Sequence, residues 1–319
     1  MVHARLNSIT LHGHGLPLPA FFASVSSVKT RFSPLDYIRF LVATRASPFL
    51  VSAFDIHHMG GAAQDEALAA LHNSRGGGAA TLLDSGNYER YWHRNSTWRP
   101  RQFCSILARA ATPLAFCYDN QEPAGDIDQD TEDIIGRVTS AQAVTNDTTV
   151  IAIVHGNRNV LPTLCLSVAK RLAPILVAVP ERELGGGIIE RIETVRAIRT
   201  SLDTTGAYVP LHLLGTGNPW SLALYTMAGA DTFDGLEWCQ TSVDANTGQL
   251  HHFSQADLFM DGASSAEAFA ERTLLHNLAF YGDWMAQLQN AVSENRVQEF
   301  VTSRLPSQVV ATLRTRGVM

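Results

Sequence analysis

Eight short apolar runs recur along the chain, and each ends in a small or polar residue. They begin at Phe21, Phe49, Ala80, Pro113, Thr149, Pro174, Val209 and Ala230. Near-continuous apolar runs of this length are typical of strands that are buried on both faces, as in a parallel sheet. Segments with helical spacing of apolar residues separate them, for example at 33–46, 64–75, 131–144, 188–202 and 219–229. The pattern therefore predicts strands that alternate with helices.

The order of these elements predicts an α/β protein of the (β/α)8 TIM-barrel class. Two predicted helices carry start signals, because Ser33 precedes Pro34 and Asn218 precedes Pro219. An open doubly wound sheet is the alternative, but no G-x-G-x-x-G follows the first strand. We expect one barrel domain over residues 1–319, with 246–319 as an insertion and a C-terminal helical extension. The insertion is loop-rich over 246–265, and strongly helical sequence follows over 264–305.

Composition places the chain among ordinary globular proteins. Of 319 residues, 45% are hydrophobic and 17% are charged, which excludes a disordered or low-complexity chain. No apolar run reaches the ~18 residues of a membrane span, and the first ten residues lack the apolar core of a secretory signal. The four cysteines lie far apart and indicate neither a disulfide framework nor a zinc ribbon. We expect a soluble cytoplasmic enzyme.

The charge balance limits how the chain can contact nucleic acid. Lys and Arg total 24 against 30 Asp and Glu, which gives a formal net charge of −6 and a pI near 6.0. Because this argues against a broad basic surface, any contact with nucleic acid must use a local patch. Residues 88–101 interleave aromatic residues with arginines, which suits stacking on nucleic acid. A partly buried loop packed by its own aromatic residues is the alternative.

Polar side chains collect at the carboxyl ends of the predicted strands, where barrels of this class carry their chemistry. The residues at these ends are Ser24, Asp55, Asp84, Asp119, His155, Glu181, Gly215 and Asp234. An aspartate after a strand is also a common helix cap, but several at one mouth favour a site. Two carboxylates there can carry out glycosyl transfer, in which one attacks the anomeric carbon and the other moves protons. A third can accept hydrogen bonds from the N–H donors of a guanine edge.

A metal site is the competing interpretation. The residues that would take part are His12, His14, His155, His212 and Asp234. Imidazoles and one carboxylate would hold zinc with an open position, as in the metal-dependent amidohydrolases. However, His12 and His14 precede the first buried strand rather than end it, which weighs against this interpretation.

Five segments, in this order, resemble motifs of the tRNA-guanine transglycosylase superfamily, and most closely its 7-deazaguanine DNA transglycosylases. They are LLDSGNYE from Leu82, FCYDNQEP from Phe116, IAIVHGN from Ile151, GADTFDGLEW from Gly229 and TLLHNLAFYGDWMAQLQNAV from Thr273. They are similar to the family's D-S-G-G-[YF]-Q, F-D-E-C-T-P, V-Q-G, G-V-D-M-F-D and H-N-L-x-F-Y. The resemblance covers most of the chain, and it implies a (β/α)8 barrel that exchanges guanine in a polynucleotide for a 7-deazaguanine.

The resemblance also implies roles for single residues. Asp234 would be the nucleophile that forms a covalent glycosyl intermediate, and Asp84 would be the general acid and base. The residues implied in substrate binding are Asp119, His155, Gly156, Tyr88, Ser85 and Gly86. Among them, Asp119 would bind the guanine edge, and Tyr88 would stack on the base. Asp231 is the runner-up to Asp234 on the eighth strand, but by this match it would only flank the site.

The chain departs from the family at its zinc site and in its base pocket. The family's C-x-C-x-x-C cluster is missing, since only Cys239 lies between Asp234 and His276. Side chains that could replace those cysteines are His251, His252, Asp257 and Asp261. Charged loop residues are more often solvated, so we expect no structural zinc and no cofactor. Asn87, Glu89 and His155 stand where the family has Gly, Gln and Gln, so the base pocket differs.

The expected partners are a nucleic acid and a 7-deazaguanine base such as 7-cyano-7-deazaguanine. DNA is favoured over tRNA, and no membrane partner is expected. Helper proteins and a homodimer are further possible partners. Four alternative functions are a queuosine- or archaeosine-type tRNA-guanine transglycosylase, a non-catalytic partner subunit of one, a barrel glycosidase acting on a small sugar, and a metal-dependent amidohydrolase.

Overall fold

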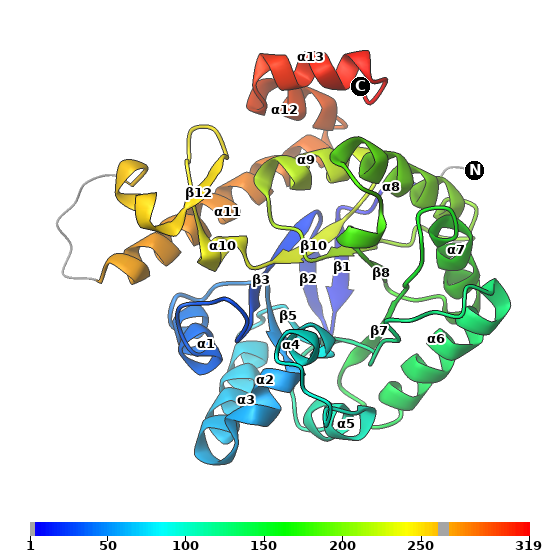
Figure 1. Cartoon of the computed structure of the whole chain (residues 1–319), viewed down its shortest axis with the longest axis vertical. Coiled ribbons are helices and arrows are strands. Elements are labelled where there is room, and N and C mark those ends of the chain that lie inside the picture. The colour runs from blue at the N-terminus through cyan, green and yellow to red at the C-terminus, as the bar shows by residue number, and fades with distance from the viewer. Residues whose placement is uncertain (1–3, 261–267) are drawn as a thin grey trace.

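The computed structural model describes residues 4–260 and 268–319, which contain a closed barrel of eight parallel strands (Figure 1). In chain order the barrel strands are β3 (Ala20–Val25), β4 (Phe49–Ser52), β5 (Thr81–Asp84), β6 (Leu114–Phe116), β7 (Thr149–Ile153), β8 (Val177–Pro180), β9 (Leu211–Leu214) and β10 (Thr232–Gly235). Each strand pairs with the next in sequence, and β10 closes the barrel by pairing with β3. The predicted (β/α)8 TIM barrel is therefore confirmed, and each of the eight apolar runs supplies one strand.

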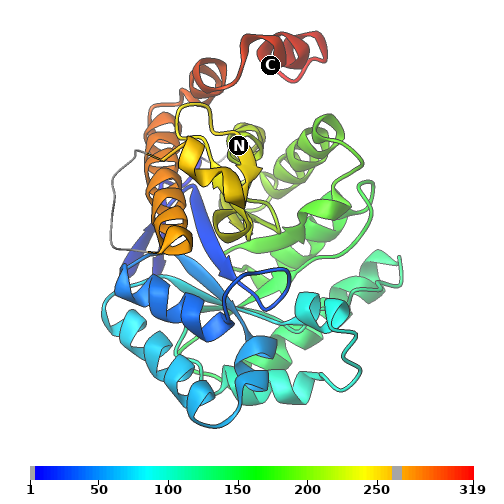
Figure 2. The ribbon, with the colours of Figure 1, turned by 60° about the vertical axis from the view of Figure 1, so that its left-hand side comes forward.

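Helices surround the barrel (Figures 1 and 2). Those between barrel strands are α1 (Pro34–Ala43), α2 (Ala53–Met59), α3 (Gly61–Gly76), α4 (Asn87–Trp92), α5 (Pro100–Leu107), α6 (Ile127–Gln142), α7 (Leu161–Leu172), the 3-10 helix η1 (Glu181–Glu183), α8 (Ile188–Leu202) and α9 (Pro219–Ala228). The predicted start signals are confirmed, because Ser33 caps α1 and Asn218 caps α9, each followed by proline. The run from Phe49 was predicted too long: β4 ends at Ser52, and Asp55 lies in the first turn of α2.

Alternation along the strands fills the inside of the barrel with apolar side chains. The inner cluster is Ile9, Leu11, Leu16, Leu18, Ala20, Phe22, Leu50, Leu82, Leu114, Phe116, Ile151, Ile153, Leu176 and Ala178. Its first four members lie in or beside an N-terminal hairpin of β1 (Ser8–Leu11) and β2 (His14–Pro17). This hairpin covers the N-terminal end of the barrel, so the opposite end is the one available for polar side chains.

A short extension follows the last barrel strand. It consists of α10 (Glu237–Gln240), β11 (Thr241–Val243), β12 (Leu250–His252), the 3-10 helix η2 (Phe253–Leu258), α11 (Phe269–Ser293), α12 (Val297–Arg304) and α13 (Ser307–Thr315). Figure 2 shows α11 along the side of the barrel, with α12 and α13 beyond it. Residues 261–265 of the predicted insertion, and 264–267 of the predicted helical segment, lie outside the described residues.

The long helix α11 packs directly on the barrel. The ring of Tyr281 stacks on Phe21 of β3 with centroids 4.5 Å apart, and its hydroxyl donates to the carbonyl of Gly217. The Asn277 amide donates to two carbonyls at the end of α10 and accepts from the N–H of Val243. In the described part of the chain, no helix is both long and apolar enough to cross a membrane.

Candidate active site

Strand alternation decides which side chains reach the mouth of the barrel. Asp84 lies two residues after Leu82, which points into the barrel, and it therefore points to the same side. Asp234 lies opposite Phe22, another inward-facing residue, across the β10–β3 pair. Both aspartates are also at the carboxyl ends of their strands. They consequently face one mouth, as the sequence predicted.

Three donors converge on the side chain of Asp234. Ser24 Oγ donates to Oδ2 at 2.9 Å, while His212 Nε2 and the N–H of Gly215 lie 3.0 and 3.1 Å from Oδ1. His212 is fully buried in β9, and its Nδ1 lies 2.9 Å from the Thr232 hydroxyl. In this arrangement Thr232 can donate to Nδ1 while Nε2–H donates to Asp234. The carboxylate is thus held in one orientation, with Oδ2 accepting fewer of these bonds than Oδ1.

Asp84 has a different environment. Burial raises the pKa of this carboxyl well above its ordinary value, and the charges of Glu89 and Asp119 raise it further. Asp234 adds a smaller contribution in the same direction, as expected for two carboxyl groups at one mouth. The N–H of Gly86 donates to Oδ2 at 2.8 Å and opposes the rise. A carboxyl group with a raised pKa keeps its proton to higher pH than an ordinary aspartate, which suits a general acid.

The turn after Asp84 requires glycine. Gly86 has a φ of 84°, in the left-handed region that favours residues without a Cβ. A Cβ placed there would also lie 2.4 Å from the Cβ of Phe54, closer than any real contact. Gly86 therefore fixes the direction in which the chain leaves β5 and enters α4.

Asp119, His155 and Glu183 form a row of hydrogen-bonded side chains at the mouth. His155 Nε2 lies 2.7 Å from Asp119 Oδ2, and His155 Nδ1 lies 2.7 Å from Glu183 Oε1. Burial alone would lower the pKa of His155, but the bonds and charges of the two carboxylates outweigh it and raise the pKa to about 9. Both ring nitrogens therefore carry a hydrogen near neutral pH, and each donates to a carboxylate.

The carboxylate of Asp119 accepts hydrogen bonds from four side chains. Ser85 Oγ and Asn87 Nδ2 donate to Oδ1 at 2.8 and 2.7 Å. His155 and the amide of Gln121 donate to Oδ2. Burial would raise the pKa of Asp119, but these donors, His155 first, outweigh it and lower the pKa. Gln121 is the exposed member of this group, so it is the partner that a ligand could displace at the lowest cost.

Tyr88 and Gly156 are the remaining predicted binding residues. Tyr88 is on the outer side of α4, 40% exposed, with its ring centroid 6.3 Å from that of Trp92. The N–H of Gly156 donates to Glu183 Oε2 at 2.8 Å, so it is already engaged. Both ring nitrogens of His155 are engaged as well, so neither residue presents a free donor in this conformation.

Two other strand-end carboxylates have structural partners. The Tyr225 hydroxyl donates to Glu181 Oε1 at 2.6 Å, and Arg191 forms an ion pair with the same oxygen. Ser27 donates its N–H and its hydroxyl to Asp55. These bonds give Glu181 and Asp55 a structural role, so a role in catalysis is not needed to account for the two carboxylates.

Asp231, which the resemblance placed beside the site, lies at the other end of the barrel. It is fully buried, and it accepts hydrogen bonds from Arg5, Tyr208 and the N–H of Leu211. Because it precedes β10, it ties the N-terminal segment to the N-terminal end of the barrel. Asp231 is therefore a structural residue.

Three carboxyl groups near the mouth were not among the predicted site residues: Glu183, Glu237 and Glu89, which the sequence marked only as a departure from the family's Gln. Ser26 and Ser52 donate to Glu89, and burial is the main cause that raises its pKa to about 7. Burial likewise raises the pKa of Glu237 to about 7, and Asp234 adds to the rise. Their position in the sequence could have indicated two of them, because Glu237 lies two residues after the end of β10 and Glu183 three residues after the end of β8.

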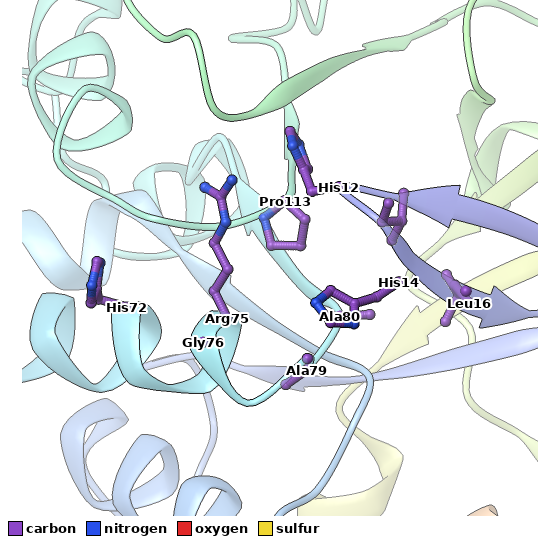
Figure 3. Close-up of a pocket in the computed structure, with 12 residues that line it drawn as sticks. His12, His14, Leu16, His72, Arg75, Gly76, Ala79, Ala80 and Pro113 are labelled. Atoms are coloured by element: carbon purple, nitrogen blue, oxygen red, sulfur yellow. The ribbon is translucent and has the colours of Figure 1, made fainter.

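The histidines of the alternative metal site do not converge. His12 and His14 belong to the N-terminal hairpin and line a hollow of about 290 Å³ with His72 and Arg75 (Figure 3). The hollow is also lined by residues that directly precede β5 and β6, so it lies at the N-terminal end of the barrel. His155 and His212 lie at or near the mouth instead. Within residues 4–260 and 268–319, no three metal-binding side chains form a cluster.

The residues near the family's zinc position do not fit that site. Cys239 is buried, with its Sγ 3.3 Å from the carbonyl of Leu236, and His276 Nε2 donates to the carbonyl of Val243. His252 bonds to Ser254, whereas His251 stacks on Phe259 and its buried Nε2 has no hydrogen-bond partner among the described residues. Asp257 is within 3.6 Å of Arg272, and Asp261 lies outside the described residues. The absence of a cofactor stays a prediction.

Comparison of the chain with protein-family models and with curated proteins found no match in either case. The geometry of the site and the residues that carry the resemblance are therefore what supports a function.

Proposed function

We propose that this protein is a transglycosylase that exchanges guanine in a polynucleotide, DNA rather than tRNA, for a 7-deazaguanine such as 7-cyano-7-deazaguanine. The observation that carries the proposal is the contrast between two aspartates at one mouth. The pKa of Asp84 is raised, as suits a general acid, whereas three donors orient Asp234. Double displacement at an anomeric carbon needs such a pair, one group to attack and one to move protons.

In the first step, Asp234 attacks C1′ of the target nucleotide. Oδ2 is the attacking atom, because it accepts only the Ser24 hydroxyl while Oδ1 is held by His212 and Gly215. The ester bond to C1′ forms as the bond from C1′ to N9 of guanine breaks, and that electron pair leaves with guanine. Asp84 supplies the proton that neutralises the departing base.

In the second step, the incoming 7-deazaguanine attacks the ester. Asp84, now deprotonated, takes the N9 proton of the incoming base, and N9 forms the new bond to C1′. The ester bond breaks and its electron pair returns to Asp234. Both aspartates are then in their starting states, and no redox cofactor is consumed.

Asp119 is the group proposed to recognise the base. Its lowered pKa keeps it an acceptor, which suits the neighbouring N1–H and N2–H donors of guanine. The base would displace the exposed Gln121 amide from Oδ2, while Ser85, Asn87 and His155 continue to orient the carboxylate. Reading this edge requires that the nucleotide leaves the duplex stack.

The direct test is incorporation of labelled guanine. The purified chain is incubated with radiolabelled guanine and either single-stranded DNA, duplex DNA or bulk tRNA, and incorporation is counted after precipitation. We expect incorporation into DNA, fastest in single strands, and a loss of about 10³-fold or more in Asp234→Asn. Asp147→Asn is the matched control, because Asp147 is exposed and lies two residues before β7, at the N-terminal end of the barrel.

Each result assigns a function. Incorporation that persists in Asp234→Asn refutes the covalent mechanism. Incorporation into tRNA alone replaces the DNA assignment with a tRNA one. A wild-type chain that incorporates nothing into any of the three substrates contradicts the proposal and supports a non-catalytic subunit.

A further inference from the structure

Helix α4 is amphipathic in the reverse of the usual sense. A surface helix normally turns its apolar side chains inward. In α4 the polar residues Asn87 and Glu89 are buried, while Tyr88, Tyr91 and Trp92 are 40%, 75% and 46% exposed. These are half of the six large apolar side chains that are exposed in the described part of the chain. The aromatic rings therefore contribute little to the packing of the fold.

Cationic side chains accompany these rings. Lys29 Nζ lies 4.0 Å from the ring centroid of Trp92. Arg94 follows the helix and is exposed, and no described residue forms an ion pair or side-chain hydrogen bond with its guanidinium. Between residues 85 and 101 the one carboxylate is Glu89, which is buried. A local cationic and aromatic patch therefore exists on a chain whose net charge is −6.

The position of the patch connects it with the mouth. α4 begins three residues after Asp84, and it packs on α2 beside the barrel (Figure 1). Tyr88 and Tyr91 are three residues apart, about 4.5 Å along the helix axis. This spacing is close to the ~3.4 Å step between neighbouring bases of a strand. Rings on α4 can thus meet bases next to one that enters the mouth.

We propose that Lys29, Tyr88, Tyr91, Trp92 and Arg94, here called the α4 surface, bind a single strand of DNA on one side of the target guanine. Neighbouring bases stack on Tyr88, Tyr91 and Trp92, and the two cations meet the phosphates. A single strand fits better than a duplex, because stacking on protein rings requires bases whose faces are free. The proposal rests on the proposed function for the identity of the target base, but strand binding itself needs no chemistry.

Fluorescence anisotropy of a labelled 12-nucleotide DNA strand with one guanine tests this inference. We expect the strand to bind at least tenfold tighter than its duplex, and to bind more weakly as salt rises. Tyr91→Ala and Trp92→Ala should each weaken binding by about tenfold. Trp92→Phe should retain most of the binding. Val144→Ala is the control, because Val144 is 39% exposed and lies near the start of β7, at the other end of the barrel.

Three results would overturn the inference: wild-type affinity in both alanine variants, equal binding of strand and duplex, or a matching RNA strand bound more than tenfold tighter than DNA. A concentration-dependent dimer that both alanine variants abolish would also overturn it, since the surface would then bind a second copy. Strand binding that is intact in a chain without base exchange supports the α4 surface and contradicts the proposed function. Base exchange with an unchanged KM for DNA in Trp92→Ala supports the proposed function and contradicts the α4 surface.

Discussion

The ionisation of His155 offers a quantitative test of the site. Its pKa of about 9 exceeds the ordinary 6.5 because Asp119 and Glu183 outweigh the effect of burial. The difference corresponds to about 3 kcal/mol of stabilisation. A raised pKa stabilises the folded state below the unfolded pKa, and this contribution disappears as pH rises through the folded pKa. We therefore expect the free energy of unfolding to lose about 3 kcal/mol from this group between pH 6.5 and 9.

Glu183→Gln removes one of the two charges and keeps the shape of the side chain. An opposite charge at this distance shifts a pKa by about 1 to 3, so the pKa of His155 should fall to about 7. The variant should then unfold about 3 kcal/mol more easily than the wild type at pH 6, and equally easily above pH 9. Urea unfolding across this pH range measures the difference, and an NMR titration of the His155 ring measures the pKa.

The matched control is Glu122→Gln, because Glu122 is exposed on the loop after β6 and its side chain makes no hydrogen bond within residues 4–260 and 268–319. It should leave both quantities unchanged. A wild-type ring that titrates near 6.5 would contradict the charge effect of Asp119 and Glu183 on His155. So would a Glu183→Gln variant that is destabilised by the same amount at pH 6 and pH 10, because the loss would then be one of packing rather than of charge.

Three further predictions concern the same mouth. Asp119→Ala should raise the KM for the free base more than it lowers kcat, and an unchanged KM would remove Asp119 from base recognition. Asp84→Asn should lower base exchange and remove the fall in rate that we expect of the wild type as rising pH deprotonates Asp84, so a variant with the wild-type pH profile would contradict the acid role. Gly86→Ala should lower the free energy of unfolding by about 2 kcal/mol or more, because a Cβ would meet Phe54 and strain a left-handed backbone; wild-type stability in urea would contradict it.

The barrel could be predicted from the sequence because strand signals are local. Eight apolar runs, each separated by a helical pattern, leave few arrangements other than a closed parallel sheet. The placement of Asp84 and Asp234 followed from the same pattern, since the carboxyl ends of parallel strands lie at one edge. The end of β4 could not be predicted as well. Ala53 and Phe54 are apolar, and a short apolar run is compatible with a buried strand or with the buried start of a helix.

The partners of these aspartates could not be predicted. His212 was expected only as a metal ligand within a strand, yet it holds Asp234 from the neighbouring strand, 22 positions earlier in the chain. Glu183 meets His155 across 28 positions. Such pairs depend on rotamers and on the register of adjacent strands, which leave no periodic signal in one sequence. The sequence likewise did not indicate which aromatic residues of 88–101 are buried, since Trp98 is fully buried while Trp92 is exposed.

The two proposals together account for the opposite charges of the mouth and of the α4 surface. Buried carboxyl groups lie at the mouth. Burial first, and neighbouring carboxylates in addition, raise the pKa values of Asp84, Glu89 and Glu237, so further negative charge is unfavourable there. A phosphate would be repelled, whereas a base edge with N–H donors would be accepted. The phosphates of a bound strand must therefore stay outside, where Lys29 and Arg94 supply positive charge. A nucleotide whose base enters the mouth while its backbone remains at α4 satisfies both conditions, and an extruded guanine has this geometry.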